Sequence, residues 1–468
     1  MAIDQACASR FDEYVDLLAD VVGHADRRAP LFAYCRGLIL PGDRKSVEPM
    51  AARIAPTHVR SMHQSMNHFV SESGWSDEAM LRAARHYAMG PILGQGPLEA
   101  WIVDDTGFPK KGKHSVGVAN QYCGCLGKNA NSQNAVSISL ANRAASIPVA
   151  FQLYLPESWA SDDVRRTEAG VPSILDFMTK WQIALTLVDS LLSDDVPMAP
   201  FLGDAGYGNA TEFRDGLTLR GFPYVLGIGP AITVWPAGAE PLPPYPRTGR
   251  RGRPAKLLHR DDEHKPLAVK ALAKSLAASM WAEIEWREGT KGTMSSRFAV
   301  MRVRPAHRDE KRTEVRAEEW LLIEWPEDEP DPTRYWLSTM PPDLSLEDLV
   351  CLAKLRWRIE RDYQELKDEI GLDHFEGRGW RGFHHHASLC IATYAFIVAE
   401  RARISPPRPC TIFGLEEPAL SESPDARENP PRVARQKPTT HPGPGHCPEL
   451  PYFCPPELTH PEALLPGS

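Results

Sequence analysis

The sequence lacks any long apolar run and any export signal. No apolar stretch approaches the about 18 residues that a membrane-spanning helix needs, so we expect no transmembrane segment. The first residues, MAIDQACASRFDEY, contain neither the basic region nor the apolar core of a secretory signal. We therefore expect a cytoplasmic protein that makes no contact with a membrane.

Cysteine usage gives no disulfide framework and no strong zinc signal. The nine cysteines are an odd number and are scattered, with only Cys123 and Cys125 close together. A single Cys-x-Cys without a second pair is a weak metal motif, and scattered thiols are typical of reducing compartments. Ordinary reduced thiols are the preferred interpretation.

An excess of positive charge is also missing. The formal net charge is -8, which by itself argues against a nucleic-acid binder. The basic residues are nevertheless clustered, while acids crowd residues 324–331, so a globally acidic protein can still contain a basic channel. The clusters are Lys110, Lys111, Lys113 and His114; Arg247, Arg250, Arg251, Arg253 and Lys256; and Arg356, Arg358, Arg361 and Lys367.

The chain is long enough for two or three domains. It has 468 residues, 42% of them hydrophobic, which fits a globular protein with a substantial core. Residues 1–93 show no strand-like alternation and have amphipathic segments near 9–23, 57–71 and 77–89. This pattern predicts a separate N-terminal helical domain.

Strands begin after residue 93. Residues 135–140 and 148–155 predict two strands of a hairpin, and an apolar-periodic helix is predicted over 173–192. Residues 220–342 are rich in aromatic strand-like runs such as FPYVLGI and EEWLLIEW, separated by polar loops. The predicted fold class is α/β, with a core that begins at residues 94–219 and is interrupted by a β-rich insertion.

The end of the chain has two different parts. Residues 343–403 are predicted to be helical and to complete the core after the insertion. Residues 404–468 are rich in proline and contain few apolar residues, so we expect a disordered tail without a fold.

Aspartates end two of the predicted strands. The segment LEAWIVDD is apolar on both alternating faces, as a central buried strand is, and it ends in Asp104 and Asp105. A second short strand, MAPFLGD, ends at Asp204. Carboxylates at the ends of adjacent strands can meet across a sheet. Alternation says only that Asp104 and Asp105 point to opposite faces.

A helix is predicted over residues 346–370. Ser345, with Asp348 three residues later, is a candidate capping box, and Gly371 is a candidate stop. The apolar residues in between follow the 3.6-residue period of a buried helix face, namely Leu349, Leu352, Leu355, Ile359, Tyr363 and Leu366.

An acid lies among bases on one face of this helix. At 100° per residue, Arg356, Glu360 and Lys367 fall within about 40° of one another, and Glu360 lies at the edge of the buried face. Three carboxylates brought within 4 to 5 Å would repel by about 3 to 4 kcal/mol per pair. Hard oxygen ligands favour Mg²⁺ or Mn²⁺, and a pair of such ions suits phosphodiester chemistry. A lone strand-end Asp or helical Glu is more often a cap or a solvated side chain.

These residues resemble a known family. RWRIE followed by Lys367 resembles the signature helix of bacterial insertion-sequence DDE transposases of the Tn-five-like YREK group. Arg356, Glu360 and Lys367 keep the spacing of that motif, whereas Ala353 stands where the family has tyrosine. VDDTGFPKKGKHSVGVANQYCG, GDAGYG and RWRIERDYQELKDEIGLDHFEGR together resemble the insertion-sequence-701 branch, over about residues 30 to 400.

The resemblance implies a ribonuclease-H-like catalytic core with two Mg²⁺ ions, for which Mn²⁺ can substitute. It assigns Asp105, Asp204 and Glu360 as catalytic and metal-binding residues, because the family's first aspartate directly precedes threonine. The implied activity is that of a DNA transposase that binds the inverted repeats of its element through the N-terminal helices. It would cut the ends and join the 3′-hydroxyl to target DNA, as a homodimer in the synaptic complex at the nucleoid.

Further residues are candidates for contacts with double-stranded DNA. Trp336, with Tyr335, lies near the position where related transposases stack an aromatic on a flipped base, although a core role is as plausible. Arg251 and Arg253 belong to an RGRP segment that suits A·T-rich minor grooves or forms a solvated basic loop. His384, His385 and His386 are expected to face solvent or phosphate. Candidate phosphate contacts are Arg356, Lys367, Arg358, Lys110 and Lys111.

Two other functions stay open. A transposase-derived repressor would bind DNA without cutting it, and a ribonuclease-H-like nuclease would cut RNA or an RNA/DNA hybrid. The proline-rich tail also allows a frameshifted or truncated, inactive copy.

Overall fold

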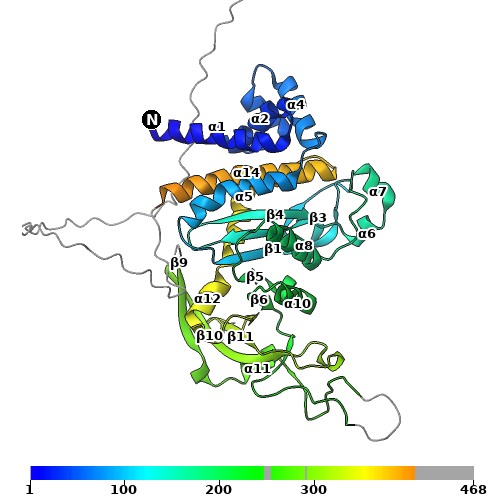
Figure 1. Cartoon of the computed structure of the whole chain (residues 1–468), viewed down its shortest axis with the longest axis vertical. Helices are drawn as coiled ribbons and strands as arrows, with labels where there is room; N and C mark the ends of the chain where they lie inside the picture. The colour runs from blue at the N-terminus through cyan, green and yellow to red at the C-terminus, as the bar shows by residue number, and fades with distance from the viewer. Residues whose placement is uncertain (1, 247–254, 290–291, 406–468) are drawn as a thin grey trace, which may run out of the picture.

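The computed structural model describes residues 2–246, 255–289 and 292–405. Arg251, Arg253 and nearly all of the proline-rich tail lie outside these residues. The described chain forms a mixed α/β structure in which helices cover a large mixed sheet and a β-rich part extends from one end of it (Figure 1). None of the helices in these ranges is long and apolar enough to cross a membrane.

The centre of the sheet has the order β4-β3-β1-β5-β6. β5 and β6 run parallel to β1, while β3 is antiparallel to both β1 and β4. The predicted hairpin is confirmed as β3 and β4, and a further strand, β2, pairs with the start of β3. The strands are β1 (Ala100–Pro109), β2 (Ala119–Cys123), β3 (Lys128–Ala141), β4 (Ser146–Leu153), β5 (Phe201–Gly203) and β6 (Tyr224–Ile228).

The insertion continues this sheet. Its last strand, β12, pairs antiparallel with β6, and β11 and β10 follow outward from it. Tyr224–Ile228, which the sequence placed in the insertion, is therefore the last parallel strand of the central sheet. The elements are β7 (Thr233–Trp235), β8 (Leu267–Ala268), α11 (Val269–Lys274), β9 (Ala282–Gly289), β10 (Gly292–Pro305), β11 (Glu319–Trp325) and β12 (Arg334–Ser338).

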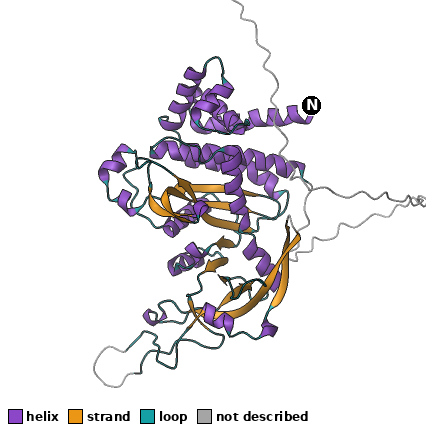
Figure 2. Ribbon diagram, turned by 180° about the vertical axis from the view of Figure 1, so that it is seen from behind, coloured by secondary structure: helices purple, strands orange, loops and turns teal. Residues whose placement is uncertain are grey.

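The N-terminal helices share their core with the sheet. The predicted amphipathic segments are helices, and α5 lies beside the long C-terminal helix α14 against β4 (Figures 1 and 2). One continuous apolar core runs from α1 through α5 and α14 to the sheet, so residue 93 does not divide two cores. The helices are α1 (Ala2–Val22), α2 (Arg28–Ile39), α3 (Val47–Ile54), α4 (Val59–Ser71), α5 (Asp77–Leu93) and α14 (Trp380–Ile404).

The three consecutive histidines of α14 are buried, so the expectation that they face solvent or phosphate is wrong. His384 is hydrogen-bonded to the Leu153 amide and the Trp380 carbonyl, and His386 lies between the Tyr34 hydroxyl and the Gly371 carbonyl. Burial lowers the pKa of His385 and of His386 to about 4. The physical reason is that helices and β4 cover α14 on all sides.

The remaining helices connect the strands. α8 starts at Lys180, later than predicted, because Thr179 and Gln182 form a capping box there. α8 contacts β3 and α10, and α9 directly follows β5. They are α6 (Glu157–Ala160), α7 (Asp163–Glu168), α8 (Lys180–Ser193), α9 (Ala205–Gly208) and α10 (Thr211–Leu219).

The predicted helix over 346–370 is present in three pieces: α12 (Leu346–Lys354), α13 (Trp357–Glu365) and a π-helical turn (Leu366–Ile370). Ser345 caps the start by accepting from the Asp348 amide, and Gly371, with φ of 80°, ends the last piece. Between α12 and α13 the backbone hydrogen bonds tighten to a three-residue spacing, as in the bond from the Arg358 amide to the Leu355 carbonyl.

Candidate active site

Asp104 lies on β1, and Asp204 directly follows β5, the parallel neighbour of β1. The β1–β5 register pairs Trp101 with Phe201 and Ile102 with Leu202, and two further residues along each strand reach these aspartates. Ile102 and Leu202 pack in the core under α12 and α13. Because side chains alternate along a strand, Asp104 and Asp204 point to that same face.

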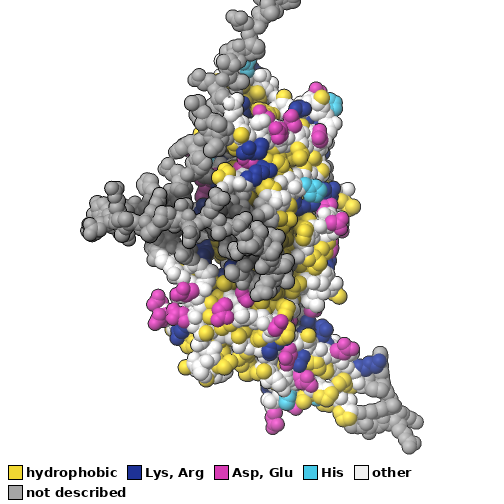
Figure 3. Space-filling view, turned by 60° about the vertical axis from the view of Figure 1, so that its left-hand side comes forward, with side chains coloured by type: hydrophobic (Ala, Val, Ile, Leu, Met, Phe, Trp, Pro, Cys, Tyr) yellow, Lys and Arg dark blue, Asp and Glu magenta, His cyan; other side chains and the backbone are white. Residues whose placement is uncertain are grey.

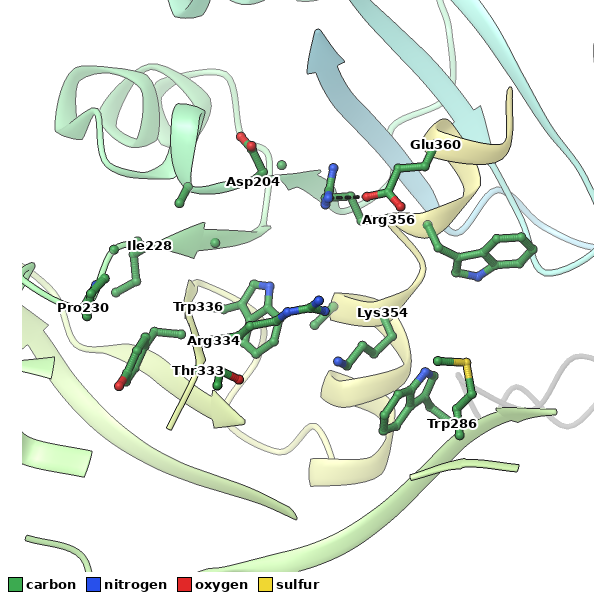
Figure 4. Close-up of a pocket in the computed structure, with 18 of the residues that line it drawn as sticks. Asp204, Ile228, Pro230, Trp286, Thr333, Arg334, Trp336, Lys354, Arg356 and Glu360 are labelled. Carbon is green, nitrogen blue, oxygen red and sulfur yellow. Dashed lines mark hydrogen bonds and ion pairs between the residues drawn. The ribbon is translucent and has the colours of Figure 1, made fainter. Parts of the chain in front are cut away.

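Arg356 joins Asp104 to Glu360. Its Nη1 donates to Asp104 Oδ2 at 2.7 Å and its Nη2 to Glu360 Oε1 at 2.5 Å. Figure 4 shows the Arg356 guanidinium between Asp204 and Glu360. The predicted Arg356–Glu360 stripe of the helix thus faces the strand-end acids.

The environments of Asp104 and Glu360 differ. The Asp104 side chain is 15% exposed and Glu360 is 57% exposed. Burial raises the pKa of Asp104 to about 7; the charges of Asp204 and Asp105 act in the same direction, and Arg356 opposes them. The site therefore holds an acid that is costly to ionise beside one that projects into solvent.

Asp204 caps the short helix α9. Its Oδ1 accepts from the backbone amides of Gly206 at 2.9 Å and Tyr207 at 3.4 Å. A Cβ on Gly208 would lie 2.0 Å from the Gly227 carbonyl oxygen of β6, so only glycine allows this approach. The GDAGYG segment thus holds Asp204 rigidly at the carboxyl end of β5.

Asp105, the predicted first acid, points away from this cluster. Its Oδ2 forms an ion pair with Lys180 Nζ of α8 at 2.6 Å. The preceding side chains on its face, Trp101 and Val103, belong to the core on the side of the sheet opposite α13. The structure thus brings Asp104, rather than Asp105, to the face of Asp204 and Glu360, because neighbouring residues of a strand project to opposite faces.

A cleft of about 590 Å³ opens beside Asp204, Arg356 and Glu360. It lies between the ends of β5 and β6, the insertion strands β9 and β12, and the α12–α13 helices (Figure 4). Basic and aromatic side chains form much of the cleft wall, namely Arg287, Arg334, Lys354, Trp286, Tyr335, Trp336 and Trp357. This composition suits a ligand that has both negative charge and flat rings.

Most of this wall was not predicted from the sequence. Trp336 lines the cleft as the sequence allowed, but it is only 7% exposed. Trp286 is half-buried, and Arg287 stacks on Trp357 with its guanidinium carbon 4.1 Å from the ring centroid. The run WAEIEWREG gave Trp286 and Arg287 a strand context but no sign of which face meets α12.

Two comparisons with known proteins bear on this site. A family model described as DDE superfamily endonuclease matches residues 17–293, more than half of the chain. The chain belongs to the DDE endonuclease superfamily. A protein of Microchaete diplosiphon, named as a probable transposase for insertion sequence element IS701, is 25% identical over 316 residues, which cover 67% of this chain and 68% of that protein.

The matched region of this DDE endonuclease covers Asp104, Asp105 and Asp204 alike. Glu360 lies beyond the matched segment. Glu360 is therefore connected to the site by geometry, through the shared contact with Arg356.

The other predicted DNA contacts of the DDE endonuclease are distributed over different surfaces. Lys367 Nζ donates to the Gly107 carbonyl at 2.9 Å, and Lys110 Nζ to the Phe375 carbonyl at 3.0 Å, while Lys111 is exposed. Arg358 donates to the carbonyls of Arg143 and Ala144, on the side of α13 away from the cleft.

Figure 3 shows no single basic stripe on the part of the described surface that grey atoms leave visible. Lysine and arginine side chains lie there in small groups among acidic and apolar ones. This matches the net charge of -8. The positive charge in direct contact with Asp104 and Glu360 is that of Arg356.

The donor set suits a divalent metal of the kind that DDE enzymes generally use. Carboxylate oxygens are the ligands that Mg²⁺ and Mn²⁺ prefer. Across residues 2–246, 255–289 and 292–405, no group of three or more His, Cys, Asp or Glu side chains is already gathered around one point. The buried Tyr207 hydroxyl, which has no hydrogen-bond partner, lies in the electrostatic range of Asp104, Asp105 and Asp204.

Proposed function

We propose that this DDE endonuclease is a transposase that cuts the ends of an insertion sequence and joins them to target DNA. The observation that carries the proposal is the register that sets Asp104 beside Asp204, with Arg356 linking Asp104 to Glu360. The 25% identical relative, named as a probable transposase, supports the same reaction class.

The order and directions of the central strands support a ribonuclease-H-like core. Three antiparallel strands, β4, β3 and β1, are followed by β5 and β6 parallel to β1. The acids lie on the central strand, at the end of the next strand and on a helix across the sheet. This arrangement would allow three carboxylates from distant parts of the chain to approach one another near the carboxyl ends of β1 and β5.

Asp104, Asp204 and Glu360 would hold the two Mg²⁺ ions, with Mn²⁺ as a substitute. When bound, the metal supplies an activated water or 3′-hydroxyl and stabilises the leaving oxygen. Asp204 is fixed by its bonds to the Gly206 and Tyr207 amides, and Arg356 holds Glu360 toward the strand-end acids. The first acid is proposed as Asp104, in place of Asp105, because only Asp104 shares the face of the other two.

The cleft wall would bind the DNA backbone and an unpaired base. Arg334 and Arg287 suit phosphates, and Arg356 is close enough to the acids to contact the phosphate being cut. Trp336 is the proposed stacking residue from the sequence, and the half-buried Trp286 offers more ring surface in the same cleft.

Recognition of the element ends is assigned to the N-terminal helices. α4 exposes Arg60, Gln64 and Asn67 along one side, and such side chains suit base edges and phosphates. Joining two ends requires two active sites, so we propose a homodimer in the synaptic complex. Lys111 and Lys367 remain candidate phosphate contacts beside β1.

A cleavage assay on DNA carrying the element ends tests the proposal. Asp204→Asn and Glu360→Gln should each reduce Mg²⁺-dependent cutting by at least about 1,000-fold, because each removes one carboxylate from the proposed metal set. Binding of the same DNA should stay within about threefold, since binding depends mostly on phosphate contacts elsewhere. Near-normal cutting by either variant would exclude that acid from the site.

A further inference from the structure

A buried carboxylate lies two residues after Glu360. Asp362 is 1% exposed, and its oxygens accept hydrogen bonds from three hydroxyl groups. Oδ1 accepts from Ser146 at 2.6 Å and from Tyr394 at 3.1 Å, and Oδ2 accepts from Ser139 at 2.9 Å. These partners belong to β4, α14 and β3, so one side chain ties α13 to three elements.

The face of β3 under α13 is polar rather than apolar. Ser137 and Ser139 alternate with the buried apolar residues of the opposite face, and Ser137 is hydrogen-bonded to the Tyr363 hydroxyl at 2.8 Å. Sheet faces that receive a helix are normally apolar, because burial of apolar surface drives the packing. The hydroxyl groups at this interface therefore contribute directional hydrogen bonds between β3 and α13 rather than buried apolar surface.

α13 needs an anchor of this kind. It has nine residues, with a tight turn before it and a π-helical turn after it, so neither end continues a regular helix. Within it, Ile359 and Tyr363 are the buried side chains with large apolar surface. A slip of one residue would rotate the helix by 100° and shift it by about 1.5 Å. Apolar contacts tolerate such changes better than a carboxylate with three directional partners does.

Asp362 and Glu360 lie on opposite sides of α13. Two residues along a helix correspond to about 200° of rotation. Asp362 therefore points into the protein while Glu360 points into the cleft toward Arg356 (Figure 4). Whatever fixes the rotation of the helix at Asp362 also fixes where the Glu360 carboxylate lies relative to Asp104 and Asp204.

We propose that Asp362 is a positioning residue for Glu360: the three hydroxyls that bind its carboxylate set the rotation and axial position of α13. The role rests on the proposed DNA cleavage, in which Glu360 acts with the strand-end acids. Asp362 does not line the cleft.

Removal of hydroxyls without added bulk tests this role. The double variant Ser139→Ala/Tyr394→Phe deletes one partner of each Asp362 oxygen. Tyr14→Phe is the matched control, because the Tyr14 hydroxyl also makes a buried bond to α14, at 2.7 Å to the Ala392 carbonyl, away from α13. The double variant should cut end DNA at least about 10-fold more slowly at saturating DNA, since misplacement by about 1 Å is enough for such a loss. The control should cut at the wild-type rate.

Two measurements separate positioning from general destabilisation. End-DNA affinity should be unchanged in the double variant, so that the loss is in kcat rather than in KM. Amide hydrogen exchange over residues 357–365 should speed up in the double variant and not in Tyr14→Phe. Unchanged exchange there, or cutting at the control's rate, would overturn the proposal.

Substitution of Asp362 itself distinguishes shape from charge. Asparagine has the same shape, and hydroxyl partners can donate or accept, so Asp362→Asn should keep cutting within about threefold while Asp362→Ala loses it. If Asp362→Asn fails as completely as Asp362→Ala while exchange over residues 357–365 stays native, positioning through hydroxyl bonds is refuted. A wild-type protein that cuts no end DNA counts against the proposed function alone, because the exchange comparison still decides the anchoring role.

Discussion

The choice between two adjacent aspartates gives the sharpest test of the proposed site. Asp104 and Asp105 are neighbours on β1, and both precede the TGFPKKG segment that resembles the transposase family. Asp104 faces Asp204 and contacts Arg356, whereas Asp105 contacts Lys180 on the other side of the sheet. Asp104→Asn and Asp105→Asn each remove one charge with almost no change in volume.

Asp104→Asn should lose DNA cutting, whereas Asp105→Asn should lose only a little stability. Neighbouring strands lie about 4.8 Å apart, so Asp104 and Asp204 are within reach of a shared ligand. Loss of Asp104 should reduce cutting by at least about 1,000-fold, equivalent to about 4 kcal/mol in the barrier. The Lys180 and Asp105 side chains are 29% and 24% exposed, so the loss of their ion pair should lower the free energy of unfolding by about 1 kcal/mol. Cutting by Asp105→Asn should stay within about twofold, because a stable fold absorbs a change of that size.

The assay combines three measurements on each variant: Mg²⁺-dependent cleavage of end DNA, affinity for the same DNA, and thermal unfolding. Lys180→Met is the matched control, because it breaks the Asp105 ion pair from the other partner and should reproduce the small stability loss. The assignment would be refuted if Asp105→Asn abolished cutting with normal folding and DNA affinity while Asp104→Asn still cut. That result would restore the residue that directly precedes threonine as the first acid.

Two further predictions concern the cleft and α14. Trp286→Leu should slow the cutting of fully paired ends by about 10-fold, which lies within the 1 to 3 kcal/mol that a stacked base contributes. DNA ends with an unpaired base next to the cut should restore the cutting rate of this variant. An equal loss on both substrates would exclude stacking. The pKa of His386 is lowered from 6.5 to about 4, so the unfolded state binds the extra proton between these values and stability falls as pH drops through that window. His386 should therefore account for about 2 kcal/mol of stability lost between pH 7 and 5, and urea unfolding of His386→Asn should show a correspondingly weaker pH dependence.

Much of the site followed from local patterns. The strand that ends in two aspartates, the hairpin after it, the Asp204 strand end and the Ser345 cap each depend on residues close together in the chain. Helical spacing alone predicted that Arg356 and Glu360 share one face of the helix, and the structure shows them as an ion pair. Such features can be predicted from the sequence because the interactions that form them join residues only a few positions apart.

Local patterns could not predict which of Asp104 and Asp105 points to the sheet face covered by α13. β1 is buried on both faces, so its apolar residues give no asymmetry that marks the side covered by α13. A rule carried over from related sequences then favoured the residue before threonine. The proposal of Asp104 instead depends on the register with β5, which is a contact between residues about 100 positions apart.

The sequence contained a sign that the histidines of α14 are buried, but the polar character of the histidine run led to the opposite prediction. The residues after them, ASLCIATYAFIVA, are apolar nearly all round the helix, and such a helix is buried on every side. Three consecutive residues span about 200° of a helix, so all three histidines had to be buried with it. Composition alone, in the form of a polar run, gave the opposite expectation.

The charge balance of the site connects these observations. Arg356 shares its single positive charge between Asp104 and Glu360. Burial raises the pKa of Asp104 to about 7, and the charge of Asp204 acts in the same direction. Additional positive charge can enter from solvent at the exposed Glu360 side. The wall of the cleft already carries Arg287 and Arg334. A nucleic-acid strand is repelled by the acids and attracted by that wall, so it can approach the carboxylates only where cations screen them. On the proposed function, this separation of charge is how a protein with a net charge of -8 would present a site for DNA.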